Sequence, residues 1–398
     1  MQLYIHIPFC ISKCAYCDFF SRPYQAVPDE YIKALCNELA FRIKSFNVTE
    51  LSTIYIGGGT PSLLTGSQLE TLFSKIRSFV KLDHNAEITV EVNPDDVSEA
   101  LLASLESCGV NRLSCGIQTM NDAALKKACR RADRENNLKA LGLLERHWKG
   151  QLSLDLISGL PLDDEKNLLQ SLEEVCSVNP CHISLYSLTI EEGTPFGMQL
   201  ESGLLSYDFD KADKLWLAGR DYLEKKGYEW YEVSNFCRPG KECLHNLGYW
   251  NHKSYLGCGS GACGTVYNED GSGERWTNSC DIKEYIDFWE QSDFRWLSSP
   301  SQTDVSKPQI DLSTLPQTSE HIDLVTSQFE FFMMGLRKIS GVSEEEYKKI
   351  FGQAFPEHFN YLFEKWEAKK LCLRRGDGRL AMSREGMLFL NRFLEELF

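Results

Sequence analysis

The chain has 398 residues, of which 42% are hydrophobic and 25% are charged, and its formal net charge at pH 7 is −15. This composition is that of a globular protein and excludes a disordered, collagen-like or repetitive chain, while the length predicts one large domain with at least one smaller one. The negative charge would repel a phosphate backbone, so no nucleic acid partner is expected. No apolar run is long enough to span a membrane and the start lacks a signal-peptide pattern, which together predict a cytoplasmic protein.

The first part of the chain alternates short β-branched or aromatic runs with longer segments of helical spacing, a pattern typical of βα units around a parallel sheet. The predicted strands are residues 3–7, 53–56, 87–92, 112–116, 153–157 and 182–188. Helical periodicity is clearest in residues 29–46, 67–80 and 166–178. Six such strands predict an α/β fold with an open, partial (β/α)6 barrel over residues 1–235.

The remainder of the chain departs from this pattern. Residues 236–296 are rich in Gly, Asn, Cys and aromatic residues with little helical periodicity, so they are interpreted as an accessory region packed on the barrel. Residues 297–319 contain many Ser, Thr, Gln and Pro residues and are predicted to be a linker or an inserted loop. Residues 320–398 combine amphipathic helices with a short strand pair around residues 376–378, which predicts a small α+β, winged-helix-like domain.

Chemically distinctive residues follow the predicted strands directly. Cys10 follows the first strand, residues 57–60 the second, Asn93 the third, Gln118 the fourth and Gly159 the fifth. Ligands of parallel α/β folds gather at the carboxyl ends of the strands, because the following loops converge there. We therefore expect one site built from all of these loops.

Three of the fifteen cysteines, Cys10, Cys14 and Cys17, lie within eight residues. An odd number of cysteines in a long chain without a signal peptide predicts reduced thiols rather than disulfides. Three thiolates can hold three irons of a cubane and leave the fourth iron open. A zinc site requires a fourth ligand, for which Cys36 or His6 is the alternative. A thioredoxin-like site would present only a lone Cys-x-x-Cys.

The spacing C-x-x-x-C-x-aromatic-C, with Tyr16 as the aromatic residue, resembles the radical S-adenosylmethionine (SAM) superfamily over residues 1–235. The resemblance implies a [4Fe-4S] cluster on the three cysteines, with SAM on the open iron. In that family, reduction of the cluster cleaves SAM to methionine and a 5'-deoxyadenosyl radical, while the protein orients and shields the cofactor.

The same resemblance implies a set of SAM-binding residues. Residues 57–61 read Gly-Gly-Gly-Thr-Pro and resemble the family's GGTP element, in which glycine lets the backbone approach SAM. Glu91 would add a carboxylate, although a strand-end acid is equally consistent with a solvated rim. The cofactor-binding positions implied by the resemblance are Tyr4, Tyr16, Gly58, Gly59, Thr60, Glu91, Gln118, Arg130 and Asp155. The family pattern Gly-Arg-x-His is replaced by residues 129–132, Cys-Arg-Arg-Ala.

Within the superfamily the chain resembles the branch of the oxygen-independent coproporphyrinogen oxidase, and within that branch the HemW group of haem chaperones. The oxidase carries a further cysteine where this chain has Phe19. Residues 245–250, His-Asn-Leu-Gly-Tyr-Trp, match the HNxxYW element of the chaperone group. His245 is a candidate axial haem ligand, with Cys243 and Cys258 as alternative thiolates. Alternatively, the element only packs and forms hydrogen bonds.

The resemblance implies a protein that binds haem and delivers it to an acceptor such as a respiratory cytochrome. Whether the chain is an enzyme stays open. One alternative is oxidative decarboxylation of coproporphyrinogen III, and another is radical methylation or opening of a porphyrin. A flavodoxin or ferredoxin is the electron donor expected if the cluster is reduced in the cell.

Overall fold

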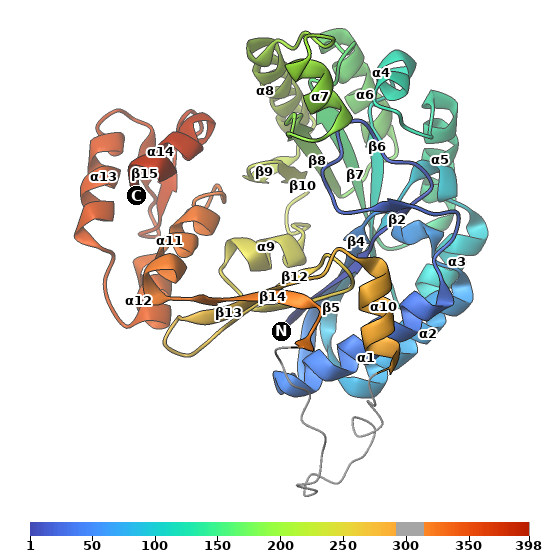
Figure 1. The fold of residues 1–398 in the computed structure, drawn as a ribbon. Coiled ribbons are helices and arrows are strands. Elements are labelled where there is room, and N and C mark those ends of the chain that lie inside the picture. Colours follow the sequence, from blue (N-terminus) through green and yellow to red (C-terminus); the bar gives the residue numbers. More distant parts are fainter. Residues whose placement is uncertain (292–313, 398) are drawn as a thin grey trace, which may run out of the picture.

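Six parallel strands form the centre of the fold and are neighbours in the order in which they occur in the sequence. The computed structural model describes residues 1–291 and 314–397 (Figure 1). The six strands are β1 (Gln2–Ile7), β4 (Glu50–Gly58), β5 (Lys81–Val92), β6 (Arg112–Gln118), β7 (Gln151–Ser158) and β8 (His182–Ser187). They contain all six predicted strands almost completely, and the predicted α/β partial barrel is confirmed.

Helices follow these strands and cover the outside of the barrel (Figure 1). Several begin at a polar residue that accepts backbone N–H bonds, as in the capping boxes of Thr65 with Gln68 and Asp133 with Asn136. The helices are α1 (Asp29–Ser45), α2 (Gly66–Phe79), α3 (Glu99–Ser107), α4 (Asp122–Lys127), α5 (Arg134–His147), α6 (Glu165–Ser177), α7 (Pro195–Glu201) and α8 (Phe209–Lys225).

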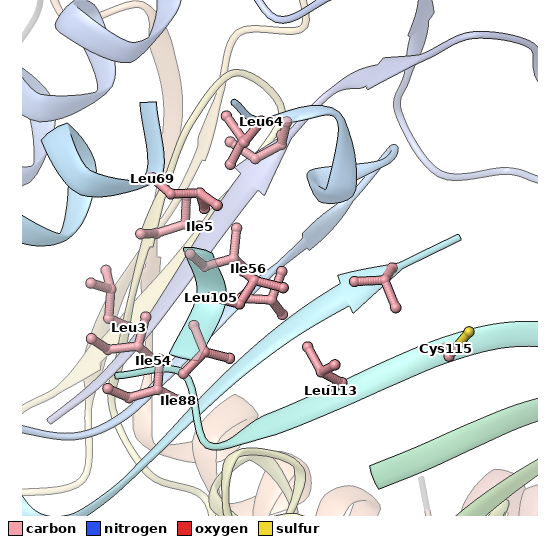
Figure 2. Packing of buried hydrophobic residues seen from close by; sticks show 14 of the residues in the cluster. Leu3, Ile5, Ile54, Ile56, Leu64, Leu69, Ile88, Leu105, Leu113 and Cys115 are labelled. Atoms are coloured by element: carbon pink, nitrogen blue, oxygen red, sulfur yellow. The ribbon is translucent and has the colours of Figure 1, made fainter. Parts of the chain in front are cut away.

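Alternation along the strands separates an apolar outer face from a polar inner face. On β1, Leu3 and Ile5 are completely buried, and in Figure 2 they lie with Ile54 and Ile56 of β4 in the same apolar layer as Leu69 of α2. The intervening residues of the barrel strands, among them Tyr4, Tyr55, Glu91, Asp155 and Tyr186, line the inner face, which we call the lumen. A functional site in the lumen therefore receives every second residue of each strand.

Further strands extend the sheet at both edges. Strand β11 (Tyr255–Cys258) pairs with β1 in parallel, followed by β12 (Cys263–Tyr267), β13 (Gly273–Asn278) and β14 (Gln317–Ile322), each antiparallel to its neighbour. At the other edge, β10 (Asn235–Cys237) pairs with β8 and β9 (Glu229–Glu232) with β10, both antiparallel. The sheet of the described residues therefore has twelve strands.

The described part of the accessory region, residues 236–291, contains more regular secondary structure than its sequence indicates. Besides β11 to β13 it contains helices α9 (Leu244–Trp250) and α10 (Ile282–Gln291), and α10 packs on α1. The sequence shows little helical periodicity there because α9 is short and the strands are Gly-rich. Residues 297–313 of the predicted linker lie outside the described residues, and the expected division between residues 319 and 320 falls inside β14.

The C-terminal part has its own apolar core, in which Phe332, Phe359 and Phe393 are almost fully buried. Its helices surround one antiparallel strand pair, as predicted. Of all the helices that the structure describes, none is both long and apolar enough to cross a membrane. Its elements are α11 (Leu324–Gly335), α12 (Glu344–Phe351), α13 (Glu357–Glu367), β15 (Cys372–Arg374), β16 (Leu380–Met382) and α14 (Leu390–Leu397).

Candidate functional site

The three clustered cysteines lie on one loop that follows β1. Cys10 ends the short strand β2 (Phe9–Cys10), which pairs with β3 (Arg22–Pro23), so the chain returns beside its own start. The middle of the loop is held by Ala15, whose N–H donates to the Ala128 carbonyl at 2.9 Å and whose carbonyl accepts from the Phe196 N–H at 2.9 Å. These backbone bonds fix the loop across the mouth of the barrel.

All three thiols are free and partly exposed. Burial raises the pKa of Cys17, and the neighbouring Cys14 and Cys10 thiols push it in the same direction, so the three groups share one neighbourhood. The Thr60 hydroxyl donates to Cys10 Sγ at 3.3 Å, and Arg130 Nη1 donates to Cys14 Sγ at 3.6 Å. Three thiols with polar donors around them fit the ligand set of a cubane cluster with one open iron. Cys129, which lies outside this group of three, is exposed.

Two glycines at the end of β4 allow close approach to the cluster loop. Gly58 has φ 110°, and a Cβ there would lie 2.5 Å from the His6 ring. A Cβ on Gly59 would lie 2.7 Å from the Phe9 carbonyl oxygen and 2.8 Å from the Phe9 nitrogen. Since these are backbone atoms of the cluster loop, only glycine keeps the loop and β4 in this contact.

The variant Gly59→Ala is therefore expected to push β4 away from Phe9 and to lower the affinity of the reconstituted protein for SAM by about 10-fold or more. Anaerobic equilibrium dialysis with SAM measures the change. Gly376→Ala is the matched control, because a Cβ there meets no atom within 4 Å. Equal SAM affinity in both variants would contradict the role of the close contact.

Tyr4 is tied to the cluster loop through His6. The Tyr4 hydroxyl lies 2.8 Å from His6 Nδ1, and His6 Nε2 lies 2.8 Å from the Phe20 carbonyl oxygen. A carbonyl only accepts, so Nε2 carries the ring hydrogen and Nδ1 accepts from Tyr4. The hydroxyl hydrogen of Tyr4 is thereby committed, and its oxygen lone pairs are available to a ligand in the lumen.

Two carboxylates lie in the lumen without a cationic partner among the residues that the structure describes. Glu91 accepts from the Tyr55 hydroxyl at 2.8 Å and from the Gly58 N–H at 3.1 Å, yet burial raises the pKa of Glu91 to about 7. Asp155 accepts from three serine hydroxyls, and burial raises its pKa as well. The donors are Ser114 at 2.7 Å, Ser184 at 2.6 Å and Ser153 at 3.2 Å. A cationic ligand between these groups would favour their ionised forms.

Arg130 connects the lumen to the cluster loop. Its guanidinium donates to the Gly116 carbonyl at 2.7 Å and to Asn93 Oδ1 at 3.3 Å, in addition to Cys14. The adjacent Arg131 instead pairs with Asp96 at 2.6 Å on the outside of the site. The structure therefore distinguishes the two arginines and places Arg130 beside the cysteines, despite the replaced family pattern.

The other predicted positions lie around the same mouth. Gln118 has φ 67°, and its amide covers Gly116, where a Cβ would lie 2.6 Å from Nε2. Tyr16 packs with the small cluster of apolar residues beneath the cysteine loop. Asn93 donates to Thr60 Oγ1 at 3.2 Å and lies directly after β5, at a position that the sequence placed at the site without a binding role. Tyr55 was not predicted, and only the alternation along β4 marks it as an inner-face residue.

His245 does not present a free ring nitrogen. Its side chain is 1% exposed, with Nδ1 at 2.7 Å from Thr53 Oγ1 and Nε2 at 3.0 Å from the Tyr249 hydroxyl. Its ring stacks on Tyr55, 5.1 Å between centroids, and burial lowers the pKa of His245 to about 3. In this conformation the imidazole is a buried group with both ring nitrogens engaged by hydroxyls, and His245 as a haem ligand stays a prediction.

The two alternative thiolates are no better placed. Cys243 and Cys258 are both buried, and burial raises the pKa of each thiol, which favours its neutral form. Cys243 Sγ lies 3.3 Å from Glu87 Oε1, beside the start of α9. No haem ligand is thus assigned by the HNxxYW element among the described residues.

Comparison with known proteins defines the class first. The family model of the radical SAM superfamily matches residues 4–175, and the model of the HemN C-terminal domain matches residues 327–389. A solved structure described as coproporphyrinogen III oxidase (HemN) from Escherichia coli has a TM-score of 0.78 at 19% identity, covering 100% of this chain and 89% of that one. That likeness shows the fold. The chain is a radical SAM protein of the HemN-like branch.

Sequence relatives then specify the family. The protein described as heme chaperone HemW from Bacillus subtilis (strain 168) is 33% identical over 401 residues, 99% of both chains. The one from Escherichia coli (strain K12) is 38% identical over 273 residues, which is 68% of this chain and 71% of the relative. The chain therefore belongs to the HemW family of haem chaperones, and the resemblance drawn from the sequence is confirmed.

Proposed function

We propose that this chain binds haem and transfers it to an acceptor protein, and that it carries a SAM-liganded [4Fe-4S] cluster on Cys10, Cys14 and Cys17. The observation that carries the proposal is the match to heme chaperone HemW over 99% of both chains. It is supported by Phe19, which is 69% exposed beside the cluster loop, where the oxidase-type pattern has a cysteine. In this proposal residues 1–235 form the cofactor-binding barrel, and residues 320–398 form the terminal domain.

The residues at the mouth of the barrel would bind different parts of the cofactor. Gly58, Gly59 and Thr60 would bring backbone to the amino acid part of SAM, and Glu91 would accept from its ammonium group. Arg130 stays beside Cys14 and would keep a hydrogen-bond donor directed at its sulfur. When bound and reduced, the cluster with SAM supplies one-electron cleavage of the sulfonium.

Tyr4, Tyr16, Gln118 and Asp155 would form the remainder of this pocket. Asp155 is the most firmly placed of them, because three serine hydroxyls orient its carboxylate. Tyr4 would accept a hydrogen bond, since its own hydrogen is directed at His6. These roles require side chains on neighbouring strands, which the parallel barrel provides.

We further propose a cytoplasmic protein that receives electrons from a flavodoxin or ferredoxin and delivers haem to an acceptor such as a respiratory cytochrome. The described helices include no membrane span. The alternative function is coproporphyrinogen III oxidation, which the HemN-like fold favours. Radical methylation or opening of a porphyrin is the third candidate, and formation of an open tetrapyrrole from haem would reveal it.

One experiment separates these functions. The protein is reconstituted anaerobically and incubated with SAM, a reductant and either haem or coproporphyrinogen III. We expect stable haem retention on the protein and no protoporphyrinogen. Turnover of coproporphyrinogen III would instead make the chain an oxidase despite Phe19, and loss of haem on gel filtration would remove the chaperone proposal.

A further inference from the structure

A series of hydrogen bonds leads from Asp155 in the lumen to the edge of the sheet. Asp155 Oδ1 accepts from the Ser153 hydroxyl at 3.2 Å, and Ser153 Oγ lies 2.6 Å from His182 Nδ1. His182 Nε2 lies 2.8 Å from the Tyr231 hydroxyl. Ser153 and His182 are in register on β7 and β8, and Tyr231 belongs to β9, the edge strand of the described sheet. These four side chains form one uninterrupted series, which we call the Asp155 network.

The two ends of the Asp155 network are accessible and its middle is buried. Asp155 and Tyr231 are both partly exposed, whereas Ser153 is 3% and His182 is 2% exposed. Bulk water is largely excluded from the buried pair, so a proton that passes between the two ends follows the hydrogen bonds. The Tyr231 hydroxyl also accepts from the Cys243 N–H at 3.2 Å, which fixes its position beside the start of α9.

The three groups beyond Asp155 can each exchange a donor for an acceptor role. A hydroxyl carries one hydrogen and two lone pairs, and a neutral imidazole has one N–H and one accepting nitrogen. Burial, together with the charge of the nearby Arg112, lowers the pKa of His182 well below its ordinary value, so the ring is neutral. Burial raises the pKa of Tyr231, which keeps its hydroxyl protonated. A proton therefore passes by a shift in which each group gives one hydrogen and accepts another.

His245, the other buried histidine described above with two hydroxyl partners, has no such outlet. Its Nδ1 lies 2.7 Å from Thr53 Oγ1 and its Nε2 lies 3.0 Å from the Tyr249 hydroxyl. Thr53 Oγ1 in turn accepts from the Gln2 side-chain amide at 3.2 Å. An amide N–H group does not accept a proton, so that series stops there. The series through His182 instead ends at a carboxylate that faces the ligand pocket.

The surroundings of Asp155 make its protonation depend on what the lumen contains. Burial raises the pKa of Asp155, although its three serine donors act in the opposite direction. The titratable groups that face it from the neighbouring strands are all neutral or negative, namely Tyr55, Glu91, Cys115 and Tyr186. SAM carries a sulfonium and an ammonium group, and a cation in this lumen favours the ionised carboxylate. Binding of SAM would thus release a proton from Asp155.

We propose that Ser153, His182 and Tyr231 form a proton path, which carries to the outside the proton that Asp155 releases when the cationic ligand SAM binds in the lumen. Asp155 gives its hydrogen to Ser153 Oγ, and Ser153 gives its own to His182 Nδ1. His182 Nε2 gives its hydrogen to the Tyr231 oxygen, and the Tyr231 hydrogen passes to water. That SAM triggers the release rests on the proposed function, whereas the path itself rests on the hydrogen bonds of the Asp155 network.

The path is tested without SAM by time-resolved infrared spectroscopy of the anaerobically reconstituted protein after a pH jump. The carboxylic C=O band that is missing in Asp155→Asn reports the protonation of Asp155. Tyr231→Phe is expected to slow the change of this band by about 10-fold or more, because it removes the last exchangeable hydroxyl of the path. Tyr228→Phe is the matched control, because the Tyr228 hydroxyl donates to the Pro180 carbonyl at 2.8 Å, outside the Asp155 network, and its loss should leave the rate unchanged.

A second pair of variants interrupts the path at its other end. Ser153→Ala and Ser184→Ala each remove one hydroxyl donor of Asp155, but only Ser153 belongs to the path. Both variants should raise the pKa of Asp155, since a carboxylate that loses a donor is less stable. Only Ser153→Ala should slow the proton exchange, so this pair decides the question if Tyr231→Phe does not fold.

Stopped-flow mixing of the reconstituted protein with saturating SAM and a pH indicator measures the release itself. Tyr231→Phe should release as many protons as the wild type, but about 10-fold more slowly. Wild-type rates of proton exchange in both Tyr231→Phe and Ser153→Ala would overturn the path. Equal proton release by Asp155→Asn and the wild type would overturn the link to SAM. Absence of SAM binding by the wild type would contradict the proposed function instead, while the infrared rates still test the path.

Discussion

Replacing Cys10, Cys14 and Cys17 together by alanine is expected to reduce the iron and sulfide of the anaerobically reconstituted protein from about four of each per chain to nearly none. The three thiols are the free, neighbouring sulfur groups of one loop, and the donors Thr60 and Arg130 already face two of them. The absorption near 400 nm typical of iron–sulfur clusters should vanish with the iron. SAM should then lose the open iron as its anchor.

The control for this change is Cys129→Ala. Cys129 is an exposed free thiol that directly precedes Arg130, so it tests whether any cysteine near the site affects loading. Iron content is expected to be unchanged in that variant. The cluster assignment would be contradicted if the triple variant kept its iron and sulfide. It would also be contradicted if the wild type bound one zinc per chain and Cys36→Ala removed that zinc.

His245→Ala is expected to destabilise the folded protein by about 2–4 kcal/mol, because it leaves a cavity under Tyr55 and removes the partners of Thr53 and Tyr249. The haem absorption spectrum, measured where the variant is folded, should match that of the wild type. His84→Gln is a suitable control, since His84 is exposed and should change neither quantity. A shifted spectrum with unchanged stability would support His245 as the haem ligand.

The same residue gives the protein a pH-dependent stability. Burial lowers the pKa of His245 to about 3 in the folded state, against an ordinary value of 6.5. Between these values the unfolded chain binds the proton and the folded chain does not, so the contribution of His245 to stability is complete above pH 6.5 and declines as the pH falls. At pH 5 the free energy of unfolding is expected to be about 2 kcal/mol lower than above pH 6.5. Denaturant unfolding of the wild type and of His245→Gln, at pH 5 and above pH 6.5, measures this difference.

Much of the barrel could be predicted because its signals are local. Each of the six strands is a short apolar run, each covering helix has its own periodicity, and the cysteines that define the cluster loop lie within eight residues of one another. Gly58, Glu91 and Asp155 were expected from the family resemblance, and Gly58 and Glu91 lie at or near the carboxyl ends of β4 and β5, while Asp155 lies within β7. Arg130 lies at the mouth of the barrel, whereas Arg131, which no local pattern separates from it, pairs with Asp96 outside the site.

What escaped prediction depends on pairing between distant segments. Strand β11 is recognisable only through its partner β1, more than 200 residues earlier, and the Gly-rich stretch around it hides this role. Asp155, Ser184, Asn235 and Glu232 are in register across four neighbouring strands, an arrangement that no spacing in the sequence indicates. The burial of His245 and the partners of its ring nitrogens could not be predicted, because a short motif indicates neither.

The position of β1 between β4 and β11 has a consequence for the order of assembly. During synthesis the strand that leads into the cluster loop stays an edge strand until residues 255–258 have emerged, because its second parallel partner is β11. Loop closure over such a sequence separation is slow and follows local folding. The Gly259 amide then bonds to Glu38, and the Tyr31 hydroxyl links Ser260 to the His6 carbonyl. The cysteine loop is thus open to cluster donors while most of the barrel has already formed. The late pairing of β11 with β1 then closes the cofactor pocket on the β1 side.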